Sequence, residues 1–199
     1  LPILNIEQKN IVITSAARTA IGTFCGSLKN IPAHELGSVV VKEAIKKSNL
    51  LPNDIDELIM GQVLTGGAGQ NPARQAAMEA GLPETCPAMT INKVCGSAMK
   101  SVMVAGNTLR SGQAEIVVAG GMESVSLTQN EHSNSFKFHN EWLLENKPSI
   151  YDPMLKTAET VATRYGITRE AMDEYSYQSQ MRTAAAQEAG RFDDEIVPM

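Results

Sequence analysis

The sequence predicts an α/β protein in which helices are layered on a sheet. Short apolar runs of the kind found in buried strands alternate with longer segments of helical periodicity through the first 121 residues. Glycine, proline and polar residues separate these segments, as they do where helices and strands end. Strand–helix alternation of this kind predicts a layered α/β sheet.

Each element follows from its own pattern. Strands are expected at residues 11–14, 58–60, 87–94 and 114–121. Helices are expected at residues 32–49, 71–82 and 96–112, the first opened by Pro32 and the others closed by Gly81 and Gly112. The expected apolar faces are Leu36, Val40 and Ala44 on the first helix and Ala98, Val102, Ala105 and Leu109 on the third.

The chain changes character after residue 126. Residues 127–153 are polar and aperiodic, which predicts a long loop. Two helices are expected beyond it, at residues 155–166 and 169–189, the second capped by Thr168. Residues 193–199 have the pattern of a beginning strand.

Composition excludes several classes of function. The net charge of −5 argues against a nucleic-acid surface. No apolar run reaches the ~18 residues that span a bilayer, so we expect no membrane association. Three cysteines without a CxxC pair argue against a disulfide framework and a zinc site. Free thiols suit the cytoplasm, with an organelle matrix as the alternative.

Cys95 stands at the corner between the predicted strand 87–94 and the predicted helix 96–112. A helix N-terminus offers backbone N–H groups and a positive dipole end, which favour a thiolate and can stabilise the oxyanion of an attacked carbonyl. The small residues after Cys95 leave room for a substrate. The pattern therefore suits a nucleophile. Free cysteines also pack in cores, and the spacing taken alone favours that second interpretation.

Two motifs carry a resemblance to a known family. "NKVCGSAMKSVMVAG" (92–106) followed by "AEIVVAGGMESVS" (114–126) resembles the thiolase family, which comprises acetyl-CoA acetyltransferases and 3-ketoacyl-CoA thiolases. "MGQVLTGGAGQNPARQAAMEAGLP" (60–83) and the helices after residue 153 agree with it in order, and only about 127–150 departs, being shorter. "GGMESVS" and the later helices favour thiolases over the related ketoacyl synthases.

The resemblance implies a domain organisation. Residues 1–120 would form an N-terminal thiolase-like α/β/α domain and residues 121–192 part of a helical loop domain. Residues 193–199 would begin a strand that returns to the N-terminal domain. The family's C-terminal half would be missing from this chain.

The resemblance also implies a reaction. Cys95 would be the nucleophile that carries the acyl group, with its backbone N–H in the oxyanion hole. The substrates would be acyl-CoA, acetyl-CoA and CoA, in fatty acid or ketone-body metabolism, with no separate cofactor or metal. Met154 would lie in the CoA pocket, since it alone matches the family's "HMG" stretch, and Gly96 and Met122 would pack near the site. A homodimer or higher oligomer would follow.

The remaining thiolase motifs, "NEAF", "GHP" and "CxG", do not occur. His34, His132 and His139 stand outside a Gly-His-Pro context, and Cys25 and Cys86 do not match the acid/base cysteine. We therefore expect a first half that cannot turn over without the missing C-terminal half. The alternatives are a non-catalytic truncated subunit or interface fragment, and a ketoacyl-synthase-like enzyme.

The glycine-rich stretch "TGGAGQNPAR" (65–74) has two interpretations. It could cradle a phosphate, but it lacks the endings of a P-loop and of a dinucleotide fold. Spacing alone favours a flexible turn before a helix. The resemblance makes it a subunit-interface loop near the site.

Overall fold

The computed structural model describes residues 10–199 and divides the chain into two compact units. Unit 1 runs to Ser133 and includes Glu195–Met199, whereas unit 2 is Asn134–Asp194. The turn after residue 120 belongs to unit 1 because Met122, 7% exposed, packs in its core. The predicted domain boundaries at residues 120 and 192 therefore differ from the boundaries of these two units. The assignment of the thiolase-like domains to residues 1–120 and 121–192 stays a prediction.

Unit 1 is built on a parallel sheet of β2 (Glu57–Gly61), β3 (Ala88–Ile91) and β4 (Val117–Gly121), in the order β3-β2-β4. In the register of the sheet, Leu58 pairs with Ala88 on one side and with Val118 on the other. The predicted α/β class is confirmed. A separate parallel pair joins β1 (Arg18–Thr19) to β5 (Ile196–Val197).

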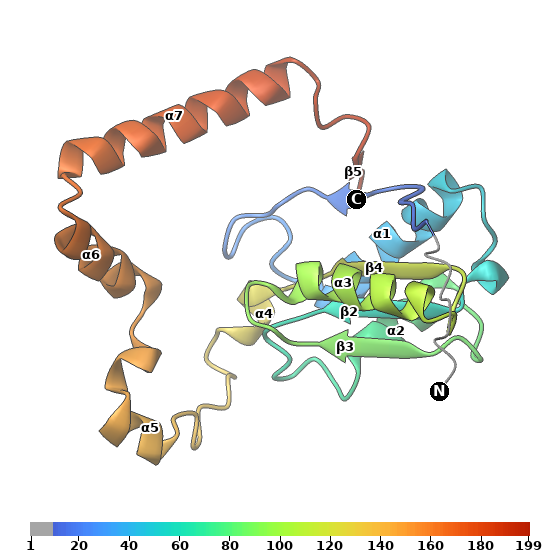
Figure 1. Cartoon of the computed structure of the whole chain (residues 1–199), viewed down its shortest axis with the longest axis horizontal. Helices are drawn as coiled ribbons and strands as arrows, with labels where there is room; N and C mark the ends of the chain where they lie inside the picture. The colour runs from blue at the N-terminus through green and yellow to red at the C-terminus, as the bar shows by residue number, and fades with distance from the viewer. Residues whose placement is uncertain (1–9) are drawn as a thin grey trace, which may run out of the picture. The chain divides into compact units, whose positions relative to one another are not determined.

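Helices cover both faces of the three-stranded sheet. Figure 1 shows α3 (Ser97–Arg110) in front of it and α1 (Ala33–Lys47) and α2 (Pro72–Ala80) behind. Strand side chains alternate between faces, so Leu58 and Met60 enter the core cluster with α1 and α2. The result is an α/β/α layer arrangement.

The buried stripe of α1 differs from the predicted one. Its fully buried residues are Ala33, Gly37, Ser38, Val41 and Ile45, whereas Leu36, Val40 and Ala44 are half-buried. A Cβ on Gly37 would lie 2.6 Å from Met122 Sδ and 3.4 Å from Ala76 Cβ. Gly37, the smallest residue of α1, thus lies where the helix packs most closely on its neighbours. The buried face is therefore shifted by about one residue from the predicted one.

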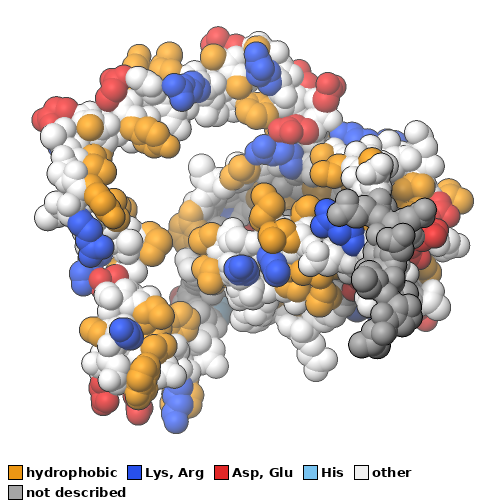
Figure 2. Space-filling model, viewed as in Figure 1, with side chains coloured by type: hydrophobic (Ala, Val, Ile, Leu, Met, Phe, Trp, Pro, Cys, Tyr) orange, Lys and Arg blue, Asp and Glu red, His pale blue; other side chains and the backbone are white. Residues whose placement is uncertain are grey.

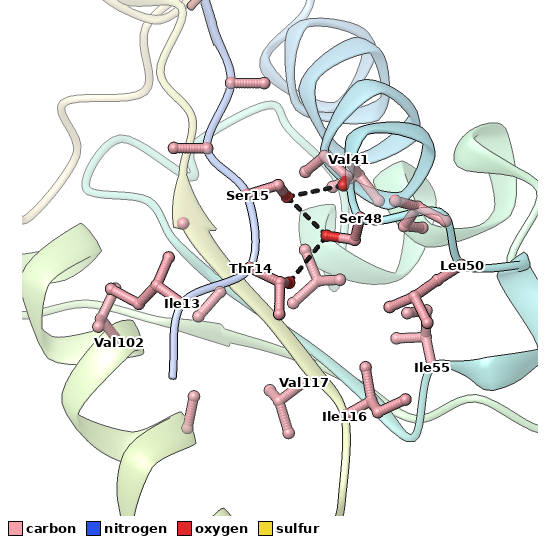
Figure 3. A pocket seen from close by; sticks show the side chains of 18 of the residues that line it. Ile13, Thr14, Ser15, Val41, Ser48, Leu50, Ile55, Val102, Ile116 and Val117 are labelled. Atoms are coloured by element: carbon pink, nitrogen blue, oxygen red, sulfur yellow. Dashed lines mark hydrogen bonds between the residues drawn. The ribbon is translucent and has the colours of Figure 1, made fainter. Parts of the chain in front are cut away.

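The predicted strand at 11–14 is wrong for this chain. Residues 10–17 form no strand, and Val12 and Ile13 are 73% and 83% exposed. A cavity of about 380 Å³ lies between this segment, α1, α3 and β4 (Figure 3). Ser15 Oγ donates to Ala44 O at 2.7 Å instead. A strand needs a neighbouring strand that receives its backbone hydrogen bonds. Here the cavity, and not a neighbouring strand, borders residues 11–17.

The predicted loop at 127–153 is only partly correct. This segment contains the end of α4 (Val125–Thr128), the helix α5 (Glu141–Asn146) and a 3₁₀ turn, η2 (Pro148–Tyr151). Another 3₁₀ turn, η1 (Pro52–Asp54), lies elsewhere in the chain, before β2. Local capping explains α5, because Asn140 Oδ1 accepts a hydrogen bond from Leu143 N at 3.1 Å. A short helix that depends on its cap shows no hydrophobic periodicity, so its sequence pattern did not predict a helix.

Unit 2 also contains the two predicted helices, α6 (Met154–Tyr165) and α7 (Arg169–Glu188). Gly166, with φ of 64°, ends α6, and Thr168 Oγ1 accepts from Ala171 N at 3.2 Å to begin α7. Within residues 10–199, no helix combines the length and the apolar character needed to cross a bilayer.

Candidate active site

The carboxyl ends of β2, β3 and β4 meet at one edge of the sheet, since the strands are parallel. The chain passes from β3 back across β2 to β4, so the strand order reverses at this edge, which is where open α/β sheets bind ligands. A cavity of about 340 Å³ lies there. It is lined by Gly61, Gln62, Val63, Val94, Cys95, Ser97, Ala98, Gly121, Met122 and Glu123.

Cys95 lies between β3 and α3, is exposed, and contributes to the cavity wall. The core-thiol interpretation therefore fails for Cys95. Cys86 occupies that role instead, because it is 3% exposed and belongs to the core cluster. Burial raises the pKa of the Cys86 thiol.

Small residues bring the start of α3 down onto the sheet. A Cβ on Gly61 would lie 2.5 Å from the backbone carbonyl carbon of Ser97, and one on Gly121 would lie 2.6 Å from Ala98 Cβ. Close approach of this kind needs glycine. It positions the corner that carries Cys95 directly over the carboxyl ends of β2 and β4.

The corner itself is strained at Val94. Its φ of 49° lies in the left-handed region, which costs a non-glycine residue on the order of 1–3 kcal/mol and is rare for a β-branched one. Ser97 Oγ supports the turn, since it lies 2.8 Å from Lys93 N and 2.6 Å from Val94 O. Asn92 Oδ1 accepts from Val94 N at 2.8 Å.

The backbone N–H groups after Cys95 are arranged differently from the prediction. Gly96 N donates to Lys93 O at 3.1 Å and Ser97 N donates to Val94 O at 3.0 Å. These two donors are already engaged inside the turn. The oxyanion contact predicted for the N–H of Cys95 itself stays a prediction.

Sequence reasoning missed the role of Glu123. Its Oε2 accepts from Val63 N at 2.8 Å and its Oε1 accepts from Leu64 N at 3.1 Å. This carboxylate is the ionisable group that shares the cavity wall with Cys95, and it anchors the backbone that leaves β2. The signal in the sequence was an acidic residue at the carboxyl end of a predicted strand.

Gln62 is a second residue that sequence reasoning missed. It is 1% exposed, and its Nε2 donates to Leu64 O at 3.0 Å. Its Oε1 has no hydrogen-bond partner among the described residues. The carboxyl end of β2 thus holds one buried acceptor without a donor.

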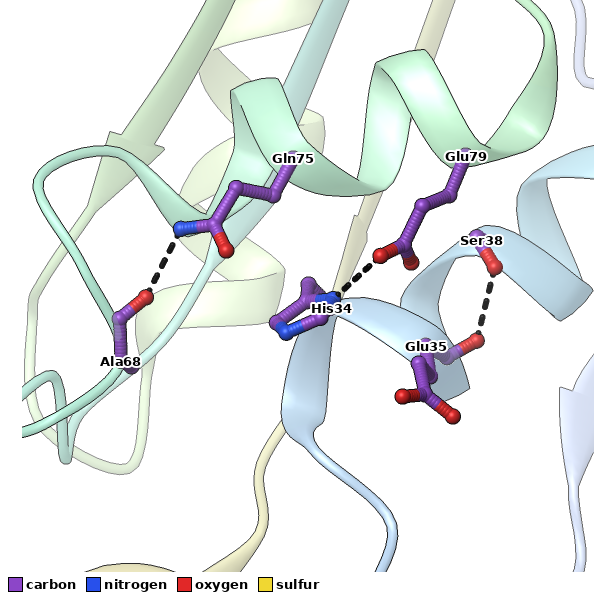
Figure 4. A network of polar contacts seen from close by, with 6 residues as sticks. All are labelled: His34, Glu35, Ser38, Ala68, Gln75 and Glu79. Atoms are coloured by element: carbon purple, nitrogen blue, oxygen red, sulfur yellow. Dashed lines mark hydrogen bonds and ion pairs between the residues drawn. The ribbon is translucent and has the colours of Figure 1, made fainter.

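The histidines lie elsewhere. His34 Nδ1 contacts Glu79 Oε1 at 2.8 Å and links α1 to α2 (Figure 4). His132 is exposed in unit 1, and His139 packs edge-on against Tyr151 in unit 2. No histidine of residues 10–199 lines the cavity at Cys95, so the described chain places no imidazole base beside the thiol.

The glycine-rich stretch 65–74 forms a turn before α2. Ala68 N donates to Thr65 O at 3.0 Å, and Gln75 Nε2 of α2 donates to Ala68 O at 2.8 Å (Figure 4). Gly67 and Gly69 have φ values of 76° and 85°. The turn interpretation is confirmed for this chain.

Comparison with known proteins gives the family. Residues 11–199 match the family described as "Thiolase, N-terminal domain". The chain belongs to the thiolase family. The family that the two motifs around residues 92–126 indicated is therefore confirmed, over the related ketoacyl synthases.

Curated relatives agree with this thiolase assignment. An "Acetyl-CoA acetyltransferase" of Cupriavidus necator is 52% identical over 96% of this chain and 51% of its own length. One of Allochromatium vinosum is 47% identical over 96% of this chain and 51% of its own length. A "Probable acetyl-CoA acyltransferase" of Staphylococcus aureus is 43% identical over 95% and 51%. The chain spans about half the length of the curated relatives it matches.

Two further thiolase expectations concern Met154 and metals. Met154 begins α6 in unit 2, where it is 73% exposed, and its predicted place in a CoA pocket stays a prediction. Among residues 10–199, no three His, Cys, Asp or Glu side chains gather in a way that could hold a metal ion.

Proposed function

We propose that this chain is the N-terminal part of a thiolase-class acyltransferase in which Cys95 carries the acyl group. One observation supports the proposal above the others. In a chain of the thiolase family, an exposed cysteine stands at the carboxyl edge of a parallel sheet, at the start of a helix. Its substrates would be acyl-CoA, acetyl-CoA and CoA, without a separate cofactor.

The proposed reaction has two halves. The Cys95 thiolate attacks the thioester carbon of an acyl-CoA, the carbonyl oxygen becomes an oxyanion near the Cys95 N–H, and the C–S bond to CoA breaks. This leaves an acyl-cysteine and CoA thiolate. In the second half, the α-carbon of acetyl-CoA loses a proton and attacks the acyl carbon, which releases Cys95 and 3-ketoacyl-CoA. Thiolytic cleavage is the reverse.

The side chains of the cavity support only the first half of the reaction, which is the acylation of Cys95. Its ionisable side chains are Cys95 and Glu123, and Glu123 already binds two backbone N–H groups. A base for the α-carbon of acetyl-CoA would therefore come from polypeptide outside this sequence. We propose that the chain accepts an acyl group once and needs the second half of the thiolase, within a homodimer or larger oligomer, to turn over.

Intact-mass spectrometry after incubation with acetyl-CoA tests the proposal. We expect an acetyl adduct that peptide mapping places on Cys95 and that disappears in Cys95→Ala. Cys25→Ala is the matched control, because Cys25 is the other exposed cysteine, and it should leave the adduct intact. An adduct that survives Cys95→Ala, or none with the wild-type chain, would contradict Cys95 as an acyl carrier in this chain.

A further inference from the structure

The turn that carries Cys95 is fastened by one amide side chain. Asn92 Oδ1 accepts from Val94 N at 2.8 Å, and Asn92 Nδ2 donates to Val63 O at 3.1 Å. The orientation of this amide is determined by its partners, since the reversed amide would set oxygen against the Val63 carbonyl and NH₂ against the Val94 N–H. Asn92 therefore makes one contact within the corner and one outside it.

The outside contact reaches a segment that is itself held. Val63 N donates to Glu123 Oε2 at 2.8 Å while Val63 O accepts from Asn92. Asn92 follows β3, Val63 follows β2 and Glu123 follows β4. The hydrogen bonds thus join the carboxyl ends of all three strands around the corner.

The inside contact acts on the strained residue. Val94 has φ of 49°, and a β-branched side chain leaves this region readily unless neighbouring contacts hold it. Ser97 holds Val94 O from the side of α3. Asn92 holds Val94 N from the side of β3, so both peptide groups that flank Val94 are fixed just before Cys95.

We propose that Asn92 is a positioning residue for Cys95, which keeps Val94 in its left-handed conformation and fastens that turn to the Val63 backbone anchored by Glu123. Asn92 need not touch a substrate for this. The inference deepens the proposed function, because a fixed corner presents the thiol and its N–H group together.

Two alkylating reagents of equal size and different charge test the proposal. In the chain carrying Cys25→Ser, Cys95 is the remaining exposed thiol, and rates with iodoacetate and iodoacetamide are measured by peptide mass spectrometry. The positive dipole end at the start of α3 attracts the anionic reagent. It raises the iodoacetate rate at Cys95 only while the corner holds the thiol beside that helix start. We expect Asn92→Ala to lower the ratio of the iodoacetate rate to the iodoacetamide rate about two- to five-fold.

Fold and mechanism are controlled separately. Cys86 is buried, so its labelling reports any opening of the fold. Asn130→Ala is the matched control, because Asn130 makes the same pair of contacts, from His132 N at 2.9 Å and to Ser126 O at 3.2 Å, away from the corner. Its ratio should equal that of the parent chain.

A double-mutant cycle separates positioning from direct contact. Glycine adopts positive φ without strain, so Asn92→Ala should matter less in a Val94→Gly background. An equal loss of the ratio in both backgrounds overturns the positioning role. So does an unchanged ratio in Asn92→Ala with Cys86 protected. If Asn92→Ala opens the fold, Asn92→Ser replaces it. Serine can still accept from Val94 N, but one hydroxyl cannot reproduce both contacts of the amide. A ratio below that of the parent chain then supports the proposal, and an unchanged ratio overturns it.

The outcome is independent of acyl transfer. Alkylation of Cys95 requires neither acetyl-CoA nor a second half of the enzyme. A missing acetyl adduct with a lowered alkylation ratio contradicts the proposed function alone. A normal adduct with an unchanged ratio contradicts the role of Asn92 alone.

Discussion

At the scale of single residues, the three cysteines should differ in reactivity. Cys25 and Cys95 are exposed, while Cys86 is 3% exposed and its thiol pKa is raised by burial. Since the thiolate is the nucleophile, iodoacetamide near neutral pH should label Cys25 and Cys95 and spare Cys86 until the chain is unfolded with urea. Peptide mapping against time measures this. Equal labelling of Cys86 in the folded chain would contradict the packing described for it.

Gly61 should not tolerate a methyl group. The added Cβ would meet the backbone of Ser97 and Ala98 at 2.5 and 2.6 Å, which no side-chain rotation relieves. Gly61→Ala should lower the free energy of unfolding by about 1–3 kcal/mol in urea titrations.

Gly106→Ala is the control for this change. A Cβ there meets no atom within 4 Å, and the residue lies inside α3. It should raise the free energy of unfolding by about 0.5–1 kcal/mol. If both variants lost stability equally, the close contact between β2 and α3 would be disproved.

At the scale of elements, Asn71 joins α2 to β3. Its Oδ1 accepts from Arg74 N at 3.3 Å and Thr90 Oγ1 at 2.7 Å, and its Nδ2 donates to Ala88 O at 2.9 Å. Asn71→Ala should cost about 1–2 kcal/mol of stability, since it removes the cap and leaves polar groups unpaired. Asn140→Ala, which removes only the cap of the exposed α5, should leave global stability nearly unchanged in the same urea titration.

Asp56 joins the starts of β2 and β4 in a pH-dependent way. Its Oδ2 accepts from Glu115 N and Ile116 N at 2.7 and 3.0 Å, and these bonds lower the pKa of Asp56. A lowered folded pKa gives stability that is present above the unfolded pKa of about 3.9 and is lost as pH falls through the folded value. Asp56→Asn should therefore lower the free energy of unfolding more at neutral pH than at a pH below the folded pKa of Asp56. Unfolding curves measured from neutral pH down to that acidic pH test this.

Asp173→Asn serves as the control for Asp56→Asn. Asp173 pairs with Arg169 on the exposed face of α7, and such pairs contribute little. An Asp56→Asn effect that does not change with pH would contradict the backbone hydrogen bonds as its cause.

At the scale of the whole molecule, the described chain leaves much apolar surface exposed. Figure 2 shows hydrophobic side chains at the surface of both units. On α3, Met99, Val102 and Met103 are 68%, 44% and 55% exposed. The folded chain should therefore enhance the fluorescence of the dye ANS, which binds exposed apolar surface. Replacing Met99 and Met103 by Gln should reduce it, and an unchanged signal would place the dye site elsewhere.

The sequence by itself determined the long helices, the strands of the main sheet and the family. Periodicity, glycine stops and Thr168 gave helices close to their observed bounds, because these signals are local. The motif around Cys95 gave both the corner and the thiolase family. The strand at 11–14 failed because a strand depends on a neighbour that no local pattern reveals.

Only the tertiary structure decided which residues share the site. Val63, Asn92 and Glu123 follow three different strands, and they meet because parallel strands bring their carboxyl ends to one edge. It also decided which thiol is buried, since Cys86 packs in the core cluster whereas Cys95 lines the cavity. Burial and hydrogen bonding between distant segments depend on the packed sheet, so local sequence patterns could not predict them.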